Sequence, residues 1–82
     1  MNDEDLRIDF SIIVVENTIN LWIDDLKRLK PIIEKAFTKW TEDRTLKNLT
    51  EYQRKLNIAL DVGRELERSA KELLELRELR GW

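Results

Sequence analysis

Residues 8–40 of the chain read IDFSIIVVENTINLWIDDLKRLKPIIEKAFTKW. Apolar residues recur in this stretch at alternating spacings of four and three positions. These residues, named here the first seam, are Ile8, Ile12, Val15, Ile19, Trp22, Leu26, Leu29, Ile33, Ala36 and Trp40. A repeat of about 3.5 residues keeps one face of a helix turned towards a partner helix along its whole length. We therefore predict one long helix that packs against another helix.

The beginning of this helix has a capping signal and a competing interpretation. Asn2 is a suitable N-cap, and the acidic residues Asp3, Glu4 and Asp5 complement the positive end of the helix dipole. Residues 6–15, however, also alternate in the manner of a strand and contain strong strand formers. We favour a helix because the same residues join a repeat that continues to residue 40, and the strand remains the alternative.

Pro31 interrupts the backbone hydrogen bonds of the predicted helix but not its seam. If Leu29 and Ile33 both face the core, Pro31 points outward, and its missing hydrogen bond bends the helix without breaking the buried face. We therefore expect one helix over about 3–40 with a kink at Pro31. The alternative is a separate short helix that starts at Pro31 and runs to Trp40.

A second helix is predicted over about 42–80. Thr41 is its expected N-cap, and Gly81 is the residue expected to adopt the left-handed conformation at its end. Apolar and small residues again step by three and four, and this second seam comprises Leu49, Tyr52, Leu56, Ala59, Gly63, Leu66, Ala70 and Leu73. Gly63 is unfavourable inside a helix, so we interpret it as a place where another backbone comes close.

The predicted fold is therefore all-α, and residues 1–82 form a single helical-hairpin domain. Both apolar stripes are wider than one helix contact can cover, so two antiparallel hairpins should join into a four-helix bundle. This topology resembles that of small homodimeric four-helix regulators, without any shared motif. The expected dimer core comprises Ile12, Val15, Ile19, Trp22, Leu26, Leu29, Ile33, Leu56, Ala59, Gly63, Leu66, Ala70 and Leu73.

The charge pattern favours one way of pairing two hairpins. Residues 1–26 carry one basic and seven acidic groups, a net charge of −6, while residues 27–55 carry nine basic and four acidic groups, a net charge of +5. Residues 56–82 carry a net charge of −1. Head-to-tail pairing sets each acidic end beside the basic corner of the partner, whereas parallel pairing stacks like charges.

The composition excludes several kinds of chemistry. The chain has neither His nor Cys. This excludes zinc sites with His or Cys ligands, catalysis by a His base and catalysis by a Cys nucleophile. Asp24, Asp25 and Glu16 suggest a carboxylate metal site, but a solvated helix surface is the better interpretation because adjacent helix residues diverge. We expect no catalytic residue, cofactor or metal. We also expect no membrane span or signal peptide, and a cytoplasmic location.

These observations favour a non-enzymatic interaction or regulatory protein that pairs with itself and binds another protein. The alternative is a regulator that binds nucleic acid through the basic region around residues 27–47. Its candidate contacts are Lys27, Arg28, Lys30, Lys35, Lys39, Arg44 and Lys47. The sequence pI of about 5.2 argues against this alternative.

Overall fold

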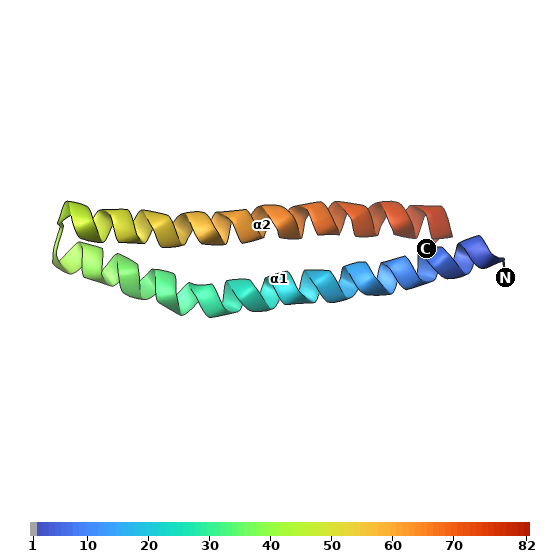
Figure 1. The fold of residues 1–82 in the computed structure, drawn as a ribbon, viewed down its shortest axis with the longest axis horizontal. Coiled ribbons are helices and arrows are strands. Elements are labelled where there is room, and N and C mark those ends of the chain that lie inside the picture. The colour runs from blue at the N-terminus through green and yellow to red at the C-terminus, as the bar shows by residue number, and fades with distance from the viewer. Residues whose placement is uncertain (1) are drawn as a thin grey trace.

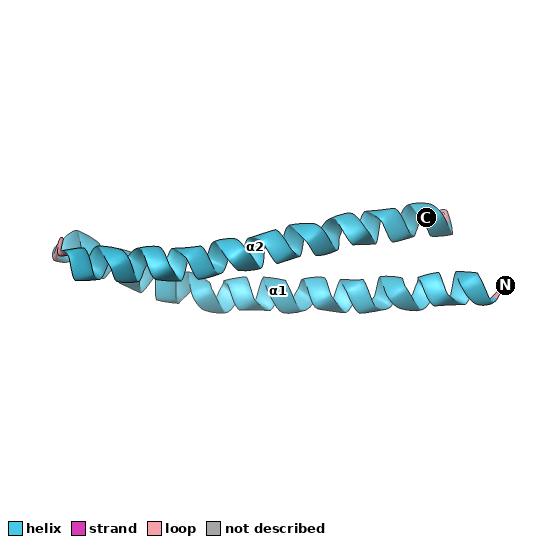
Figure 2. Ribbon diagram, turned by 45° about the horizontal axis from the view of Figure 1, so that its top comes forward, coloured by secondary structure: helices cyan, strands magenta, loops and turns pink. Residues whose placement is uncertain are grey.

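The computed structural model describes residues 2–82 and consists of two long helices. Helix α1 spans Asp3–Glu42 and helix α2 spans Leu46–Arg80. The two helices run antiparallel, side by side, and both termini lie at the same end of the rod (Figures 1 and 2). The molecule measures 62 × 15 × 15 Å. The predicted all-α hairpin is confirmed, and the strand alternative for residues 6–15 is wrong because these residues belong to α1.

The two seams form the contact between the helices. Every residue of the first and second seams is buried or half-buried. The buried apolar residues among residues 2–82 are Ile12, Val15 and Ala36, all from α1. The core of one chain is therefore a narrow line along the hairpin, with a large apolar surface left on either side.

The outer ends of both helices are capped as the sequence predicts. The side chain of Asn2 accepts a hydrogen bond of 2.8 Å from the backbone N–H of Asp5. Gly81 has a φ of 83°, the left-handed conformation that glycine adopts without strain. The N–H of Trp82 donates to the carbonyl of Arg77 at 2.8 Å, which satisfies one of the last helical carbonyls.

The corner lies a few residues later than predicted, and Thr41 is not the N-cap of α2. The hydroxyl of Thr41 donates to the carbonyl of Thr38 at 2.8 Å, which keeps Thr41 within α1. Thr45 caps α2 instead, and its hydroxyl oxygen accepts a 3.2 Å hydrogen bond from the N–H of Asn48. Thr41 and Thr45 both have a hydroxyl that can cap a helix, and the structure uses Thr45.

Pro31 lies inside α1, which continues through it to Glu42. The residue is exposed, so its missing hydrogen bond faces solvent, as expected for a bend around a core. Figure 1 shows α1 changing direction between its blue and green parts. The alternative of a separate helix that starts at Pro31 is wrong.

Gly63 does not mark a close approach within one chain. A Cβ added at this position would meet no heavy atom within 4 Å, apart from the neighbouring backbone of its own helix. A small residue allows two backbones to approach but does not force them together.

Neither of the two helices described in residues 2–82 is long and apolar enough to span a membrane.

Candidate interaction surfaces

Large apolar side chains remain exposed along the whole hairpin. Leu6, Phe10, Ile13, Val14 and Leu21 are exposed along the first half of α1. Further exposed residues are Ile32, Phe37, Leu46, Ile58, Leu60, Leu74, Leu79 and Trp82. A stable hairpin that stays alone in water rarely keeps this much apolar surface, so the exposed residues are candidates for an interaction surface.

One flank of the hairpin is hollowed by three open grooves between α1 and α2. The corner groove, of about 590 Å³, is lined by Ile32, Lys35, Ala36, Lys39, Lys47, Asn48, Glu51 and Lys55. The middle groove, of about 340 Å³, is lined by Asp25, Arg28, Leu29, Ile32, Ile58 and Val62. The open-end groove, of about 350 Å³, is lined by Arg7, Phe10, Ser11, Val14, Val15 and Glu72.

The outer residues of these grooves follow helical steps of three and four along both helices. On α1 the line passes through Arg7, Ser11, Val14, Thr18, Leu21, Asp25, Arg28, Ile32, Lys35 and Lys39. On α2 it passes through Asn48, Glu51, Lys55, Ile58, Val62, Glu65, Ser69, Glu72, Leu76 and Leu79. Residues at such spacings share one side of a helix, so the two lines form one surface, which we name the groove face.

The other flank, named here the opposite face, carries Leu6, Ile13, Phe37, Leu46, Leu60 and Leu74. A groove of about 480 Å³ on this face is lined by Ile33, Glu34, Phe37, Thr38 and Tyr52. The rings of Phe37 and Tyr52 meet there at a centroid distance of 5.4 Å and an interplanar angle of 50°. Both flanks therefore carry apolar groups, but the groove face is hollowed along more of its length.

The corner groove gathers part of the predicted basic patch. Lys35, Lys39 and Lys47 line it together with Lys55, which the sequence analysis did not include among the candidate contacts. Lys55 belongs to this group because α2 places Lys47 and Lys55 about two turns apart, beside the corner. The result is a groove with an apolar floor at Ile32 and Ala36 and four ammonium groups around it.

The remaining candidate basic residues are not brought into this groove. Arg28 lies in the middle groove and pairs with Asp25, and Lys30 lies 4.0 Å from the carboxylate of Glu34. The guanidinium of Arg44 stands 5.7 Å from the ring centroid of Trp40, within the range of a cation–π contact. Lys27 is exposed and lines none of the four grooves described.

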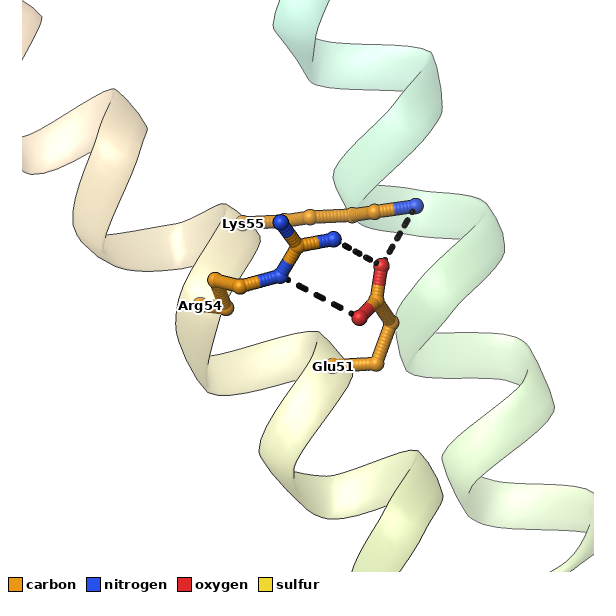
Figure 3. Close-up of polar contacts among 3 residues, drawn as sticks. All are labelled: Glu51, Arg54 and Lys55. Atoms are coloured by element: carbon orange, nitrogen blue, oxygen red, sulfur yellow. Dashed lines mark hydrogen bonds and ion pairs between the residues drawn. The ribbon is translucent and has the colours of Figure 1, made fainter.

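Glu51 is held by two cations beside the corner groove (Figure 3). Its carboxylate accepts hydrogen bonds from Arg54 at 2.7 and 3.2 Å and lies 3.3 Å from the ammonium of Lys55. The hydrogen bonds from Arg54, and then the contact with Lys55, hold the pKa of Glu51 below its usual value. The same hydrogen bonds raise the pKa of Arg54.

Asn48 is the buried polar residue of the corner. Its side-chain amide donates a 2.8 Å hydrogen bond to the carbonyl of Asp43, while its backbone N–H binds Thr45. A buried polar group is stabilising only when its partners are present. Asn48 therefore fixes the turn between the helices and forms one wall of the corner groove.

The open end of the hairpin is closed by ion pairs that join α1 to α2. Arg80 donates to Asp9 at 2.7 Å and lies 4.0 Å from Asp5, and Arg77 donates to Glu16 at 3.1 Å. The sequence pattern does not indicate these pairs because the partners are far apart in the chain. Within α2, Lys71 lies 3.5 Å from the carboxylate of Glu67, and Arg68 lies 3.5 Å from the carboxylate of Glu65.

The residues expected in a dimer core lie along the contact between α1 and α2 of one chain. Their place in a core shared by two chains stays a prediction.

Trp22, at the middle of the first seam, has a buried indole N–H with no hydrogen-bond partner among the described residues. Trp82, the third tryptophan, is 66% exposed.

The carboxylates do not gather into a metal site within residues 2–82. Asp25 faces Arg28 and Glu16 faces Arg77, so these acids have cations as partners.

No protein-family model matches the chain, and no match was found among the curated proteins or the solved structures.

Proposed function

We propose that this protein is a non-enzymatic interaction protein that pairs with a second copy of itself and presents the resulting helical bundle to another protein. The observation that carries the proposal is the narrow core of the single hairpin. Only Ile12, Val15 and Ala36 are buried apolar residues among residues 2–82, while large apolar side chains remain exposed on both flanks. Pairing two hairpins removes such surface from water, and each Å² of it contributes about 25 cal/mol.

The lack of obvious chemistry supports an interaction role rather than catalysis. The chain has no His and no Cys, which removes the commonest proton-transfer and nucleophilic groups. A rigid bundle instead offers fixed side chains on its outer surface. The flank that is not used for pairing keeps apolar residues that a partner protein can cover.

Self-association is tested by the concentration dependence of unfolding. If folding is coupled to pairing, the midpoint of thermal unfolding rises with protein concentration, as mass action requires. A midpoint that stays constant over a thousandfold range, with a monomeric mass, would overturn the proposal. Binding to another protein is tested by cross-linking in the native cell, and recovery of no protein other than the chain itself would count against that part.

The second candidate function is nucleic-acid binding, and the observation that favours it is the corner groove. Four lysines around one groove offer several phosphate contacts, whose binding weakens steeply with salt. The test measures the affinity of short RNA and DNA oligonucleotides for the wild type and for the double variant Lys35→Ala, Lys39→Ala, at low and high salt. Lys71→Ala, which changes an exposed lysine far from the corner, is the control. Absence of binding at low salt would end this candidate.

A further inference from the structure

We propose that the groove face is the surface through which two copies pair, and that they pair head to tail. This inference rests on the self-association proposed above and assigns it a face and a direction. The occupant of the grooves is therefore the groove face of a second copy, with the corner of each hairpin beside the open end of the other.

Shape is the first argument. The three grooves of the groove face lie at the corner, in the adjoining middle part and at the open end, so ridges of a second hairpin have hollows to enter in both halves of the rod. The groove described on the opposite face lies beside Phe37, near the corner. A rod of 62 × 15 Å offers a footprint of roughly 900 Å² per chain, close to the ~800 Å² that a stable interface buries on each partner.

Apolar content is the second argument. Exposed or half-buried apolar residues occur on the groove face in both halves of the rod. They are Val14, Leu21 and Ile32 on α1 and Ile58, Val62, Leu76 and Leu79 on α2. Because a two-fold pair uses the same surface on both chains, each of these residues is covered twice in one dimer.

Charge decides the direction. Residues 27–55, which form the corner half, carry a net charge of +5, and the residues on either side of them carry a net charge of −7 together. Corner-to-corner pairing would bring two grooves with four lysines each against one another. Head-to-tail pairing instead sets each such groove near the partner's open end, where Asp3, Glu4 and Asp5 begin α1 and Glu72 lines the groove. The cations of that end are Arg7, Arg77 and Arg80, of which Arg77 and Arg80 are already paired with carboxylates of α1.

The face is tested by a matched pair of substitutions on α2. Ile58 on the groove face is 44% exposed and Leu60 on the opposite face is 52% exposed, and the two side chains point roughly 160° apart around the helix. Neither side chain is buried in one hairpin, so both variants should fold, as circular dichroism would verify. Ile58→Glu should raise the dissociation constant of the dimer at least about a hundredfold, whereas Leu60→Glu should leave it within about threefold of wild type.

A second pair of variants on α1 repeats the comparison, so that the result does not depend on one position: Ile32→Glu changes the groove face and Phe37→Glu changes the opposite face. A dimer that survives Ile58→Glu, or that is lost in Leu60→Glu, would overturn the face assignment while self-association stands. A monomeric wild type would overturn the proposed function itself. The two failures are therefore distinguishable by the solution mass of the wild type.

The direction is tested with single cysteines, since the natural chain has none. In a head-to-tail pair, a chain with Lys39→Cys lies near position 7 of the other copy, and two copies of Lys39→Cys lie roughly 50 Å apart. A short bis-maleimide should therefore join Lys39→Cys to Arg7→Cys in a mixed sample, and should not join Lys39→Cys to itself. Cross-linking of Lys39→Cys with itself, or no cross-link in the mixture, would overturn head-to-tail pairing.

Discussion

The guanidinium of Arg80 donates a 2.7 Å hydrogen bond to the carboxylate of Asp9, and this pair closes the end of the hairpin that has no covalent connection. The two side chains are only 23% and 24% exposed, so solvent screens them less than a typical surface pair. The corner holds the helices together at one end, and this ion pair fixes the register at the other.

Removing this pair should loosen the open end of the hairpin. Arg80→Ala should lower the free energy of unfolding by about 1 kcal/mol, because a charge-assisted hydrogen bond across the helices is lost. Amide hydrogen exchange should accelerate mainly in the first turns of α1. Arg68→Ala is the control, since Arg68 pairs only within α2. Equal exchange rates in the two variants would show that Arg80 does not hold α1.

The corner gives a comparison between two threonines. Thr45→Ala removes the hydroxyl that caps α2 and should cost about 1 kcal/mol of stability. Thr41→Ala should cost much less, because Thr41 lies within α1 and its hydroxyl bonds only to the carbonyl of Thr38. Urea unfolding of both variants measures the difference. The reverse order would place the start of α2 at Thr41 after all.

Substitution of the neighbouring residues Ile12 and Ile13 by alanine should reduce the stability of the protein by very different amounts. Ile12 is 1% exposed in the contact between the helices, whereas Ile13 is 52% exposed on the opposite face. Ile12→Ala should cost roughly 2–5 kcal/mol through lost burial and a residual cavity. Ile13→Ala should cost well under about 1 kcal/mol, as surface changes do. Similar losses for both would mean that the opposite face is also buried in solution.

Gly63 offers a change in the stabilising direction. Because an added Cβ meets no atom within 4 Å, Gly63→Ala should raise the free energy of unfolding by about 0.5–1 kcal/mol through the backbone entropy of the unfolded chain. Thermal unfolding at fixed protein concentration measures it. A loss of stability would reveal that a second chain brings its backbone against Gly63.

Acid should weaken the contact between Glu51 and its cations. Arg54 and Lys55 hold the pKa of Glu51 below its ordinary value of 4.5, so the ionised carboxylate favours the folded state. The contribution is present above about pH 4.5 and is lost as the pH falls through the lower pKa of the folded state. Glu51→Gln should therefore be less stable than wild type at pH 7, with the difference shrinking below pH 4.5. A difference that does not change with pH would contradict this.

The arrangement of the helices follows from local patterns, which is why the sequence predicted it. The unbroken spacing from Ile8 to Trp40 and the caps at Asn2 and Gly81 each depend on residues within a few turns. Thr41 and Thr45 both carry a hydroxyl that can cap a helix, and Thr41 is also followed by the acidic Glu42 and Asp43, which favoured it in the sequence. The structure starts α2 after Thr45, where the side-chain amide of Asn48 donates to the carbonyl of Asp43. That contact has no pattern of its own in the sequence.

The candidate surfaces were predicted less completely because they depend on which residues face each other across the hairpin. Lys55 joins Lys35 and Lys39 only once the corner is placed at residues 43–45. The pairing of Arg80 with Asp9 likewise requires the register of the two helices. Residues at equal distances from the corner lie opposite one another, so a correct corner would have indicated both.

The measurement that tests the account most directly is the solution mass of the wild-type chain by light scattering, over a range of concentrations. The account predicts a mass near twice the 9.9 kDa of one chain, with high helicity in the same sample. A mass of one chain at every concentration would contradict it, because the exposed apolar residues of the groove face would then remain in water without a second copy to cover them.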